Sequence, residues 1–311
     1  MGNTYAGLTK DQTFAIEKKC LKNTQEAMVL DRFTVKKTQP KQSGKNLKFH
    51  YWDHISDNDI HVLAEGVTPD STAMVRVGVD SAIKYRGGSV KFTDELMLNH
   101  ENALEFHKET ALELSYALGV GLEKEQFTIA LAGAGTTITT AGDINADLKL
   151  VRKALRTANA GKFTTIKSGS TKSGTVPVNA GWYGFCSLDD GDLFRAATDF
   201  ISVEDYGYSE NIVDNEIGVI KSLGLRIVET QHMVDGNSLF IGEDALGSVS
   251  LGGKNKPEYI VKELGEAGVG INGSGEAVSD DLNQNGSSGI KCSTGFVVLR
   301  ADKTIKLTMT V

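Results

Sequence analysis

Hydrophobic and polar positions repeat with a helical period along Asn99–Leu131, the longest such stretch in the chain. A mostly apolar stripe recurs at intervals of three or four: Leu104, His107, Ala111, Leu114, Leu118 and Leu122. A second stripe is polar: Glu101, Glu105, Lys108, Glu109 and Glu113. Asn99 can cap the start, and no proline interrupts the stretch. The pattern predicts one helix about 45 Å long, with Gly119 and Gly121 as places where it ends or bends.

Before this helix, alternation with a period of two predicts strands. Asn46–Trp52 places Leu47, Phe49 and Tyr51 on one side, and Met74–Ser81 alternates in the same way, continuing as extended chain through Ala82–Phe92. Together these segments predict a long β-hairpin with a polar, acid-bearing tip. Because a two-stranded hairpin is marginal in water, it packs on its own domain or is stabilised by a neighbouring subunit.

After the long helix, the pattern mixes helices with short strands. Asp143–Ala160 is a second amphipathic helix, capped by Asp143 or Asn145 and ended by Gly161. Gly191–Thr198 is a short helix capped by Asp189 or Asp190. Strands are predicted at Gly181–Ser187, Glu216–Leu223, Leu225–Thr230, Ser238–Ile241, Ser248–Leu251 and Tyr259–Leu264. A final hairpin joins Ile290–Arg300 to Thr304–Val311. With no regular βαβ repeat, the fold class is α+β.

Composition narrows the class of protein. The chain has 311 residues, of which 40% are hydrophobic and 23% charged, and no run of about 20 apolar residues predicts a membrane span. Met1–Lys10 lacks the basic start and apolar core of a secretory signal. The net charge of −7 argues against tight DNA binding by the whole surface, although Lys10–Lys48 is basic. Three cysteines without CxxC spacing favour a reducing compartment.

Motifs for chemistry are weak. Gly268–Gly273 matches GxGxxG but lies in a glycine-rich loop, and Gly169–Gly174 has phosphate-loop spacing with Thr175 in place of the lysine. Asp281–Cys292 begins like a calcium loop but lacks the final glutamate. Cys186 is read as a buried structural thiol. No catalytic, cofactor or metal site is therefore predicted.

One segment leaves an alternative from another class. His50, His54 and His61 lie close together with Asp53, Asp57 and Asp59 between them, which suits a metal-dependent enzyme. A solvated hairpin tip is the simpler interpretation of the same residues.

Several stretches, in order, resemble one family. Leu63–Pro69 (LAEGVTP) resembles the extended-loop motif of the N4-type major capsid proteins of tailed phages, which have the HK97 capsid fold. Six further segments of this chain resemble other parts of the same proteins: Lys36–Trp52, Leu148–Phe163, Gly181–Ala196, Asn215–Thr230, Ser238–Ser250 and Asp281–Asp302. Asn215–Thr230, with its "VET" end, is the most specific of these.

The resemblance implies a domain organisation. Residues 1–44 would be an N-terminal arm and 45–92 an extended loop (E-loop) lying over the adjacent subunit. Residues 93–141 and 233–311 would form the peripheral domain, with the predicted helix 99–131 as its spine. Residues 142–232 would be the axial domain, packing around five- and six-fold centres.

The resemblance also implies a function. The chain would be a structural protein, not an enzyme, that self-assembles as hexamers and pentamers into an icosahedral head shell around double-stranded phage DNA. Scaffold and portal proteins, and a decoration protein where the shell carries one, would be partners; DNA would be contacted only non-specifically. Assembly would occur in the host bacterial cytoplasm and the product would be the virion. No cofactor and no membrane are implied. An encapsulin-like compartment shell is the alternative on the same fold.

Contacts between subunits would then fall on charged and aromatic residues of the extended loop and the spine. Those expected are Lys45, Lys48, Trp52, Glu65, Asp70, Arg76, Lys84, Arg86, Glu105 and Glu109. The polar stripe of the spine would face the shell interior or a neighbour's arm, with the basic Lys10–Lys48 segment as its candidate partner.

Overall fold

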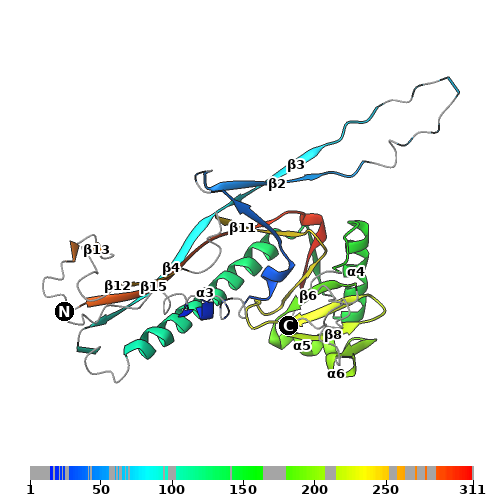
Figure 1. Ribbon diagram of the computed structural model, residues 1–311. Coiled ribbons are helices and arrows are strands. Elements are labelled where there is room, and N and C mark those ends of the chain that lie inside the picture. Colours follow the sequence, from blue (N-terminus) through cyan, green and yellow to red (C-terminus); the bar gives the residue numbers. More distant parts are fainter. Residues whose placement is uncertain are drawn as a thin grey trace, which may run out of the picture.

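The computed structural model describes residues 28–40, 44–55, 71–93, 103–140, 142–163, 180–206, 215–251, 258–262 and 285–309, with single residues and short pieces within 15–24, 42, 60–68, 95–96, 270–271 and 277–278. The chain is elongated (Figure 1). One long helix runs along the body beside a sheet, a hairpin extends away from it, and a second sheet with its helices forms a rounded unit at the carboxyl end of that helix.

The long helix is α3 (Ala103–Ala132), which has 30 residues and confirms the predicted spine. It continues through Gly119 and Gly121, so the prediction that it ends there is wrong, while a bend there stays a prediction. The cost of about 1 kcal/mol per glycine is outweighed by packing on both sides of them, where Ala111, Leu122 and Phe127 are buried.

A five-stranded sheet lies against this helix. Its order is β1 (Val35–Gln39), β11 (Leu246–Leu251), β15 (Asn285–Val298) and β12 (Glu258–Lys262), and β4 (Lys84–Thr93) also pairs with β15. The 14-residue β15 is the shared strand of this sheet. It runs antiparallel to β4 over the whole length of β4, from Asn285 opposite Thr93 to Thr294 opposite Lys84.

A seven-stranded sheet forms the rounded unit. Its order is β5 (Thr136–Thr139), β16 (Thr304–Thr308), β10 (Asn237–Ile241), β6 (Trp182–Cys186), β9 (Leu225–Glu229), β8 (Glu216–Ile220) and β7 (Phe200–Ser202). Every residue of the central strand β6 is buried. The helices of this unit are α4 (Ile144–Thr157), α5 (Leu188–Arg195) and α6 (Val203–Tyr206). Leu148, Val151 and Leu155 of α4 enter its core. Because β5, β10 and β16 belong to this sheet, its limits differ from the predicted boundaries at 141 and 232.

The predicted final hairpin is wrong. The strands β15 and β16 lie in different sheets, and the short helix η3 (Ala301–Lys303) turns the chain between them. The corner is fixed by long-range bonds, because the N–H groups of Leu299 and Arg300 both donate to the carbonyl oxygen of Ala245, at 2.8 and 3.2 Å. The strands β13 (Gly270–Ile271) and β14 (Ala277–Val278) form a separate two-stranded sheet.

Helix ends follow the sequence in part. Asp143 caps α4 as predicted, because its side chain accepts a hydrogen bond from the N–H of Asn145. The left-handed residue after α4 is Asn159 (φ 48°), not Gly161. Ser187, and not Asp189 or Asp190, caps α5, since its hydroxyl accepts from the N–H of Asp190.

The segment just before the hairpin is part of the folded body. The short helix η1 (Leu30–Phe33) packs on α3, and β1 pairs in parallel with β11. The ring of Phe33 lies among Phe163, Tyr183 and Phe185, with centroids 5.4, 4.5 and 5.1 Å away. The residues of η1 and β1 therefore pack within the fold of their own chain.

Candidate functional site

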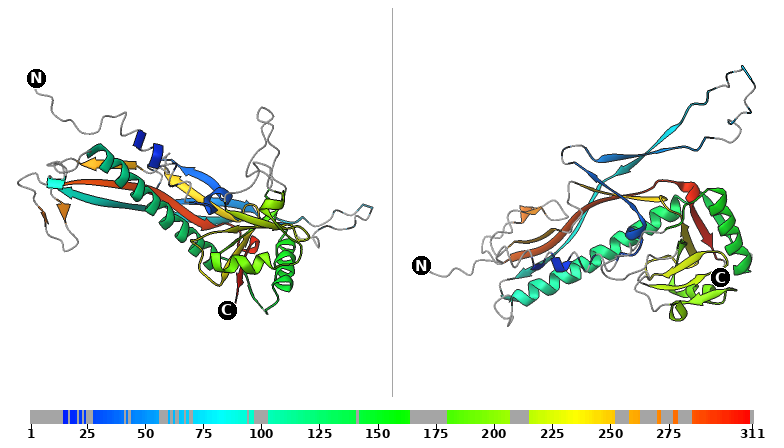
Figure 2. Two further views of the ribbon diagram at one scale, coloured as in Figure 1. Left: turned by 90° about the horizontal axis from the view of Figure 1, so that it is seen from below. Right: turned by 45° about the vertical axis from the view of Figure 1, so that its right-hand side comes forward.

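The hairpin of β2 (Asn46–Trp52) and β3 (Arg76–Ala82) stands away from the rest of the molecule (Figures 1 and 2). It is antiparallel and in register from Asn46 opposite Ala82 to Trp52 opposite Arg76, as the alternation predicted. Phe49 anchors its base, buried with Ile83, Val249 and Leu299.

Further out, the hairpin exposes several large apolar side chains. Trp52 is 53% exposed and Val62 is 99% exposed. Other large exposed hydrophobic residues of this region are Ile55, Ile60, Met74 and Val75. Arg300 holds the strand below them, because its guanidinium lies 4.4 Å from the Tyr51 ring centroid and donates to the carbonyl oxygen of Trp52 at 3.1 Å. Such an exposed apolar stretch is typical of a surface that another molecule covers.

The residues expected to make contacts between subunits differ in their exposure and in their partners within the chain. Lys45, Lys48, Trp52, Glu65, Arg76 and Glu109 are exposed. Asp70 and the side chain of Glu105 lie outside the described residues. Lys84 and Arg86 both form ion pairs with Glu125 of α3, the former at 3.0 Å, and Lys48 lies 3.7 Å from Asp80 across the hairpin. These cations thus have partners in their own chain, and their contact with a neighbour stays a prediction.

Part of the N-terminal segment covers the spine. The hydroxyl of Thr24 donates to the carbonyl oxygen of Ser115 at 3.1 Å, and Cys20 and Ile16 are buried against Ala111 of α3. Lys18, Lys19 and Lys22 of this segment are exposed. Ile16, Cys20 and Thr24 therefore lie on the spine helix of their own chain. The predicted pairing of the basic Lys10–Lys48 segment with the helix acids stays a prediction.

A buried carboxyl group joins the spine to η1, and the sequence analysis missed it. Glu123 is fully buried, and the N–H of Leu30 donates to its Oε1 at 3.0 Å. Burial raises the pKa of Glu123 to about 7, against the opposing effect of the Leu30 and Val29 N–H groups. The available signal was the continuation of the apolar stripe beyond Leu122, which places Glu123 and Gln126 beside the buried Phe127.

Glu123 predicts a pH dependence of stability. Its pKa is about 7 when folded and 4.5 otherwise, so the folded state keeps a proton that the unfolded state releases. Its contribution is full below pH 4.5 and is lost as the pH rises to about 7, by at most about 3 kcal/mol. In urea unfolding at pH 5 and pH 8, Glu123→Gln is therefore expected to lose less stability than the wild-type chain. Equal losses in both proteins would contradict this. Burial also lowers the pKa values of His107 and His232, but this affects the stability of the wild-type chain and of the variant equally.

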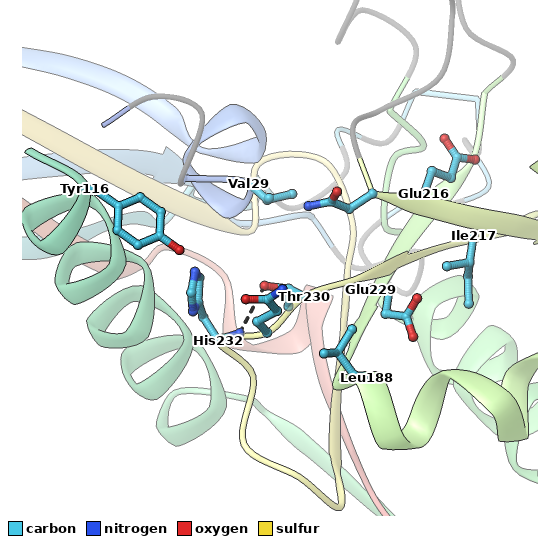
Figure 3. Close-up of a pocket in the computed structure, with 10 residues that line it drawn as sticks. Val29, Tyr116, Leu188, Glu216, Ile217, Glu229, Thr230 and His232 are labelled. Atoms are coloured by element: carbon cyan, nitrogen blue, oxygen red, sulfur yellow. Dashed lines mark hydrogen bonds between the residues drawn. The ribbon is translucent and has the colours of Figure 1, made fainter. Parts of the chain in front are cut away.

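A cavity of about 410 Å³ lies between α3, η1 and the seven-stranded sheet (Figure 3). Tyr116 and His232 line it on one side, and Glu216 and Glu229 line it on the other. Glu216 pairs with Arg226 at 2.7 Å and Glu229 with Arg195 at 3.2 Å. Both carboxylates are therefore engaged by an arginine of the same chain.

In the described part of the chain, the histidine cluster does not form a metal site. His50 and His54 lie on the exposed hairpin, while His61 is outside the described residues, and no three His, Cys, Asp or Glu side chains that are described gather as a metal site. Cys186 is fully buried, and burial raises its pKa to about 12, which confirms the structural thiol. Within the described residues, no helix is both long and apolar enough to cross a membrane.

Residues 79–307 match the family described as phage capsid protein. The chain belongs to that family. It is therefore a structural component of the virion that forms the head shell, and not an enzyme. No curated protein is significantly similar to this capsid protein.

Solved structures of similar fold are those of phage heads and particles. The head structure of Helicobacter pylori bacteriophage KHP40 has a TM-score of 0.62 at 10% identity, covering 91% of this chain and 90% of that one. The capsid structure of the cyanophage P-SCSP1u has a TM-score of 0.58 at 14% identity, covering 91% and 88%. A virus-like particle from Pyrococcus furiosus has a TM-score of 0.50 at 12% identity, covering 94% and 98%. The α+β capsid fold is thus of the HK97 type.

Proposed function

We propose that this capsid protein is the N4-type major subunit of an icosahedral head, built as pentamers and hexamers around double-stranded DNA. The observation that carries the proposal is the β2–β3 hairpin. Its outer half exposes Trp52, Ile60, Val62 and Val75 to solvent, although burial of such side chains contributes about 1.5–3 kcal/mol each. A neighbouring copy is the surface that would cover them.

The two sheets fit the two domains of the proposed subunit. The seven-stranded sheet with α4, α5 and α6 would be the axial domain, and α3 with the five-stranded sheet the peripheral domain. The hairpin would reach the adjacent subunit through Lys45, Lys48, Trp52, Glu65, Asp70 and Arg76, and the spine would contribute Glu105 and Glu109. Many modest contacts of this kind sum to a stable shell. Scaffold and portal proteins would assist its assembly.

Truncation of the hairpin tests the function. Trp52 and Arg76 are directly opposite, so residues 53–75 can be replaced by Asn-Gly, which closes a two-residue turn. The truncated protein is expected to keep its circular dichroism and thermal midpoint, since the removed residues lie beyond the buried base, but to form no shells in electron micrographs. Shells of normal size from the truncated protein would contradict the proposal.

A graded variant separates apolar burial from loop length. Ile60→Ser with Val62→Ser keeps every residue of the loop and is expected to raise the protein concentration needed for assembly. Thr72→Ser, at an exposed residue of the same loop outside the expected contacts, serves as the matched control and is expected to leave that concentration unchanged.

A compartment shell is the second candidate, favoured by the similarity to the virus-like particle from Pyrococcus furiosus. The contents of purified particles decide between the two. Nuclease-protected double-stranded DNA is expected for a phage head, whereas a protein cargo without DNA would support the compartment.

A further inference from the structure

A cavity of about 210 Å³ lies at the base of the hairpin, where β2 and β1 meet the corner between β15 and β16. Its walls come from segments far apart in the sequence: residues 35 and 37 of β1, residues 49–51 of β2, Asp244 in the turn before β11, and residues 299, 300 and 303 of the corner. Pockets for drug-sized ligands measure about 300–1,000 Å³. This cavity therefore suits a ligand of only a few atoms.

Two cations stand over the same face of β2 at this cavity. The Lys37 Nζ lies 4.7 Å from the centroid of the Phe49 ring, and the Arg300 guanidinium carbon lies 4.4 Å from that of the Tyr51 ring. Side chains two residues apart on a strand share one face and are separated by about 6.6 Å along it, so both cations line one wall. His50 also lines the cavity, but its side chain belongs to the other face of the strand and is not part of this group.

The third cation is buried. Lys303 of η3 is 8% exposed, and its Nζ donates to the carbonyl oxygen of Glu243 over a long distance of 3.4 Å. Burial lowers the pKa of Lys303, and the charge of Arg300 lowers it further. A buried ammonium group is stable when an opposite charge compensates it, and a neutral carbonyl oxygen does not supply that charge.

The carboxylates near the cavity do not balance these cations. Asp244, which lines the cavity, and Asp302 and Glu243 raise the pKa of Lys303, but their effects are smaller than those of burial and Arg300. Across the described ranges, Lys37, Arg300 and Lys303 form no ion pair with a carboxylate. Three cations and one lining carboxylate leave two positive charges in excess. The cavity is therefore suited to an anion.

We propose that this cavity binds a phosphate group, held by Lys37, Arg300 and Lys303. Arginine presents a planar fork of N–H donors that matches the oxygens of a phosphate, and lysine adds a compact charge. Arg300 is already oriented by the Tyr51 ring and by its bond to the carbonyl oxygen of Trp52, so little of its freedom is lost on binding. The bound group joins β1, β2 and the corner, and it thereby fixes the base of the hairpin to the body.

Titration of the full-length chain with inorganic phosphate tests the site. By isothermal titration calorimetry against a background of sodium chloride, the wild-type chain is expected to show saturable binding of about one phosphate per chain. Lys303→Met and Lys37→Met each keep an apolar stem and remove one charge, and each is expected to weaken the binding at least about tenfold. Lys37 is exposed, so its variant is expected to fold even if Lys303→Met does not.

Lys36→Met is the matched control. It removes the same charge from the next residue of β1, but its side chain lies on the other face of the strand, with Nζ 2.6 Å from Asp31. Binding of phosphate to this variant is expected to equal that of the wild-type chain. An equal weakening in Lys36→Met and Lys37→Met would overturn the proposal, because net charge and not the cavity would explain the effect.

Further outcomes separate the sources of the phosphate group. A short DNA duplex that displaces inorganic phosphate would support the site with the DNA backbone as its source, whereas a duplex that does not compete would support the site with a free phosphate. The absence of saturable binding to the wild-type chain, or unchanged binding in both Lys37→Met and Lys303→Met, would overturn the inference. The inference goes beyond the proposed function and needs no shell, so its failure would leave the hairpin-based function intact.

Discussion

Phe33→Ala is expected to lower the free energy of unfolding by about 3–5 kcal/mol. The ring is 3% exposed and packs edge-on against Phe163 and Phe185, with Tyr183 tilted beside it at 4.5 Å. Removing it leaves a cavity among three aromatic rings, two from β6 and one from the segment after α4. Urea unfolding followed by the fluorescence of the buried Trp182 measures the loss.

The same substitution also tests how the N-terminal segment is held. Phe33 is the aromatic residue of η1, so its removal is expected to make this segment more accessible to protease at temperatures below the main unfolding transition. Phe33→Leu, which keeps most of the volume, is the control and is expected to cost less than half as much. A loss below about 1 kcal/mol in Phe33→Ala would show that the cluster does not depend on this ring.

Glu216→Ala is expected to cost a similar amount, about 3–5 kcal/mol, for an electrostatic reason. Arg226 donates to both oxygens of Glu216, at 2.7 and 3.1 Å, and the two side chains are 8% and 0% exposed. Without the carboxylate, the guanidinium stays in the interior of the seven-stranded sheet and loses both of these bonds. Thermal unfolding monitored by circular dichroism measures the effect.

A double variant separates this buried charge from packing. Glu216→Leu with Arg226→Met replaces the pair by apolar side chains, and it is expected to recover most of the stability that Glu216→Ala loses. If the double variant were as unstable as the single one, packing and not the uncompensated charge would explain the loss.

Local patterns in the sequence predicted the elements well. The apolar stripe predicted the spine, because tertiary burial follows one face of a helix, and β2 has the same limits in the sequence pattern and in the structure. The cap at Asp143 was also predictable, since a short polar side chain at the helix start acts within two residues. The mixture of helices and strands without a regular βαβ repeat predicted the α+β class, and the ordered resemblance then predicted the capsid fold.

These local patterns did not predict which strands pair or which side chains meet between distant elements. Nothing local in Thr304–Thr308 distinguishes a partner in β15 from its actual partners β10 and β5. The ion pairs of Lys84 and Arg86 with Glu125 depend on how β4 crosses α3 and not on spacing. The sequence pattern did not single out Glu123, because only the position of η1 makes its site a buried one.

The corner between β15 and β16 has a consequence for the geometry of the shell. The end of α3 is fixed against it, since the Gly135 N–H donates to the Ala301 carbonyl oxygen at 2.8 Å. A β-carbon at Gly133 would lie 2.6 Å from Val298, so the two are packed without space for a side chain. The angle between the two sheets is thus set inside a single chain. We expect subunits in pentamers and subunits in hexamers to share this angle. The local curvature of the shell, and with it the diameter of the particle, would then be set by the parts of the chain that contact other copies.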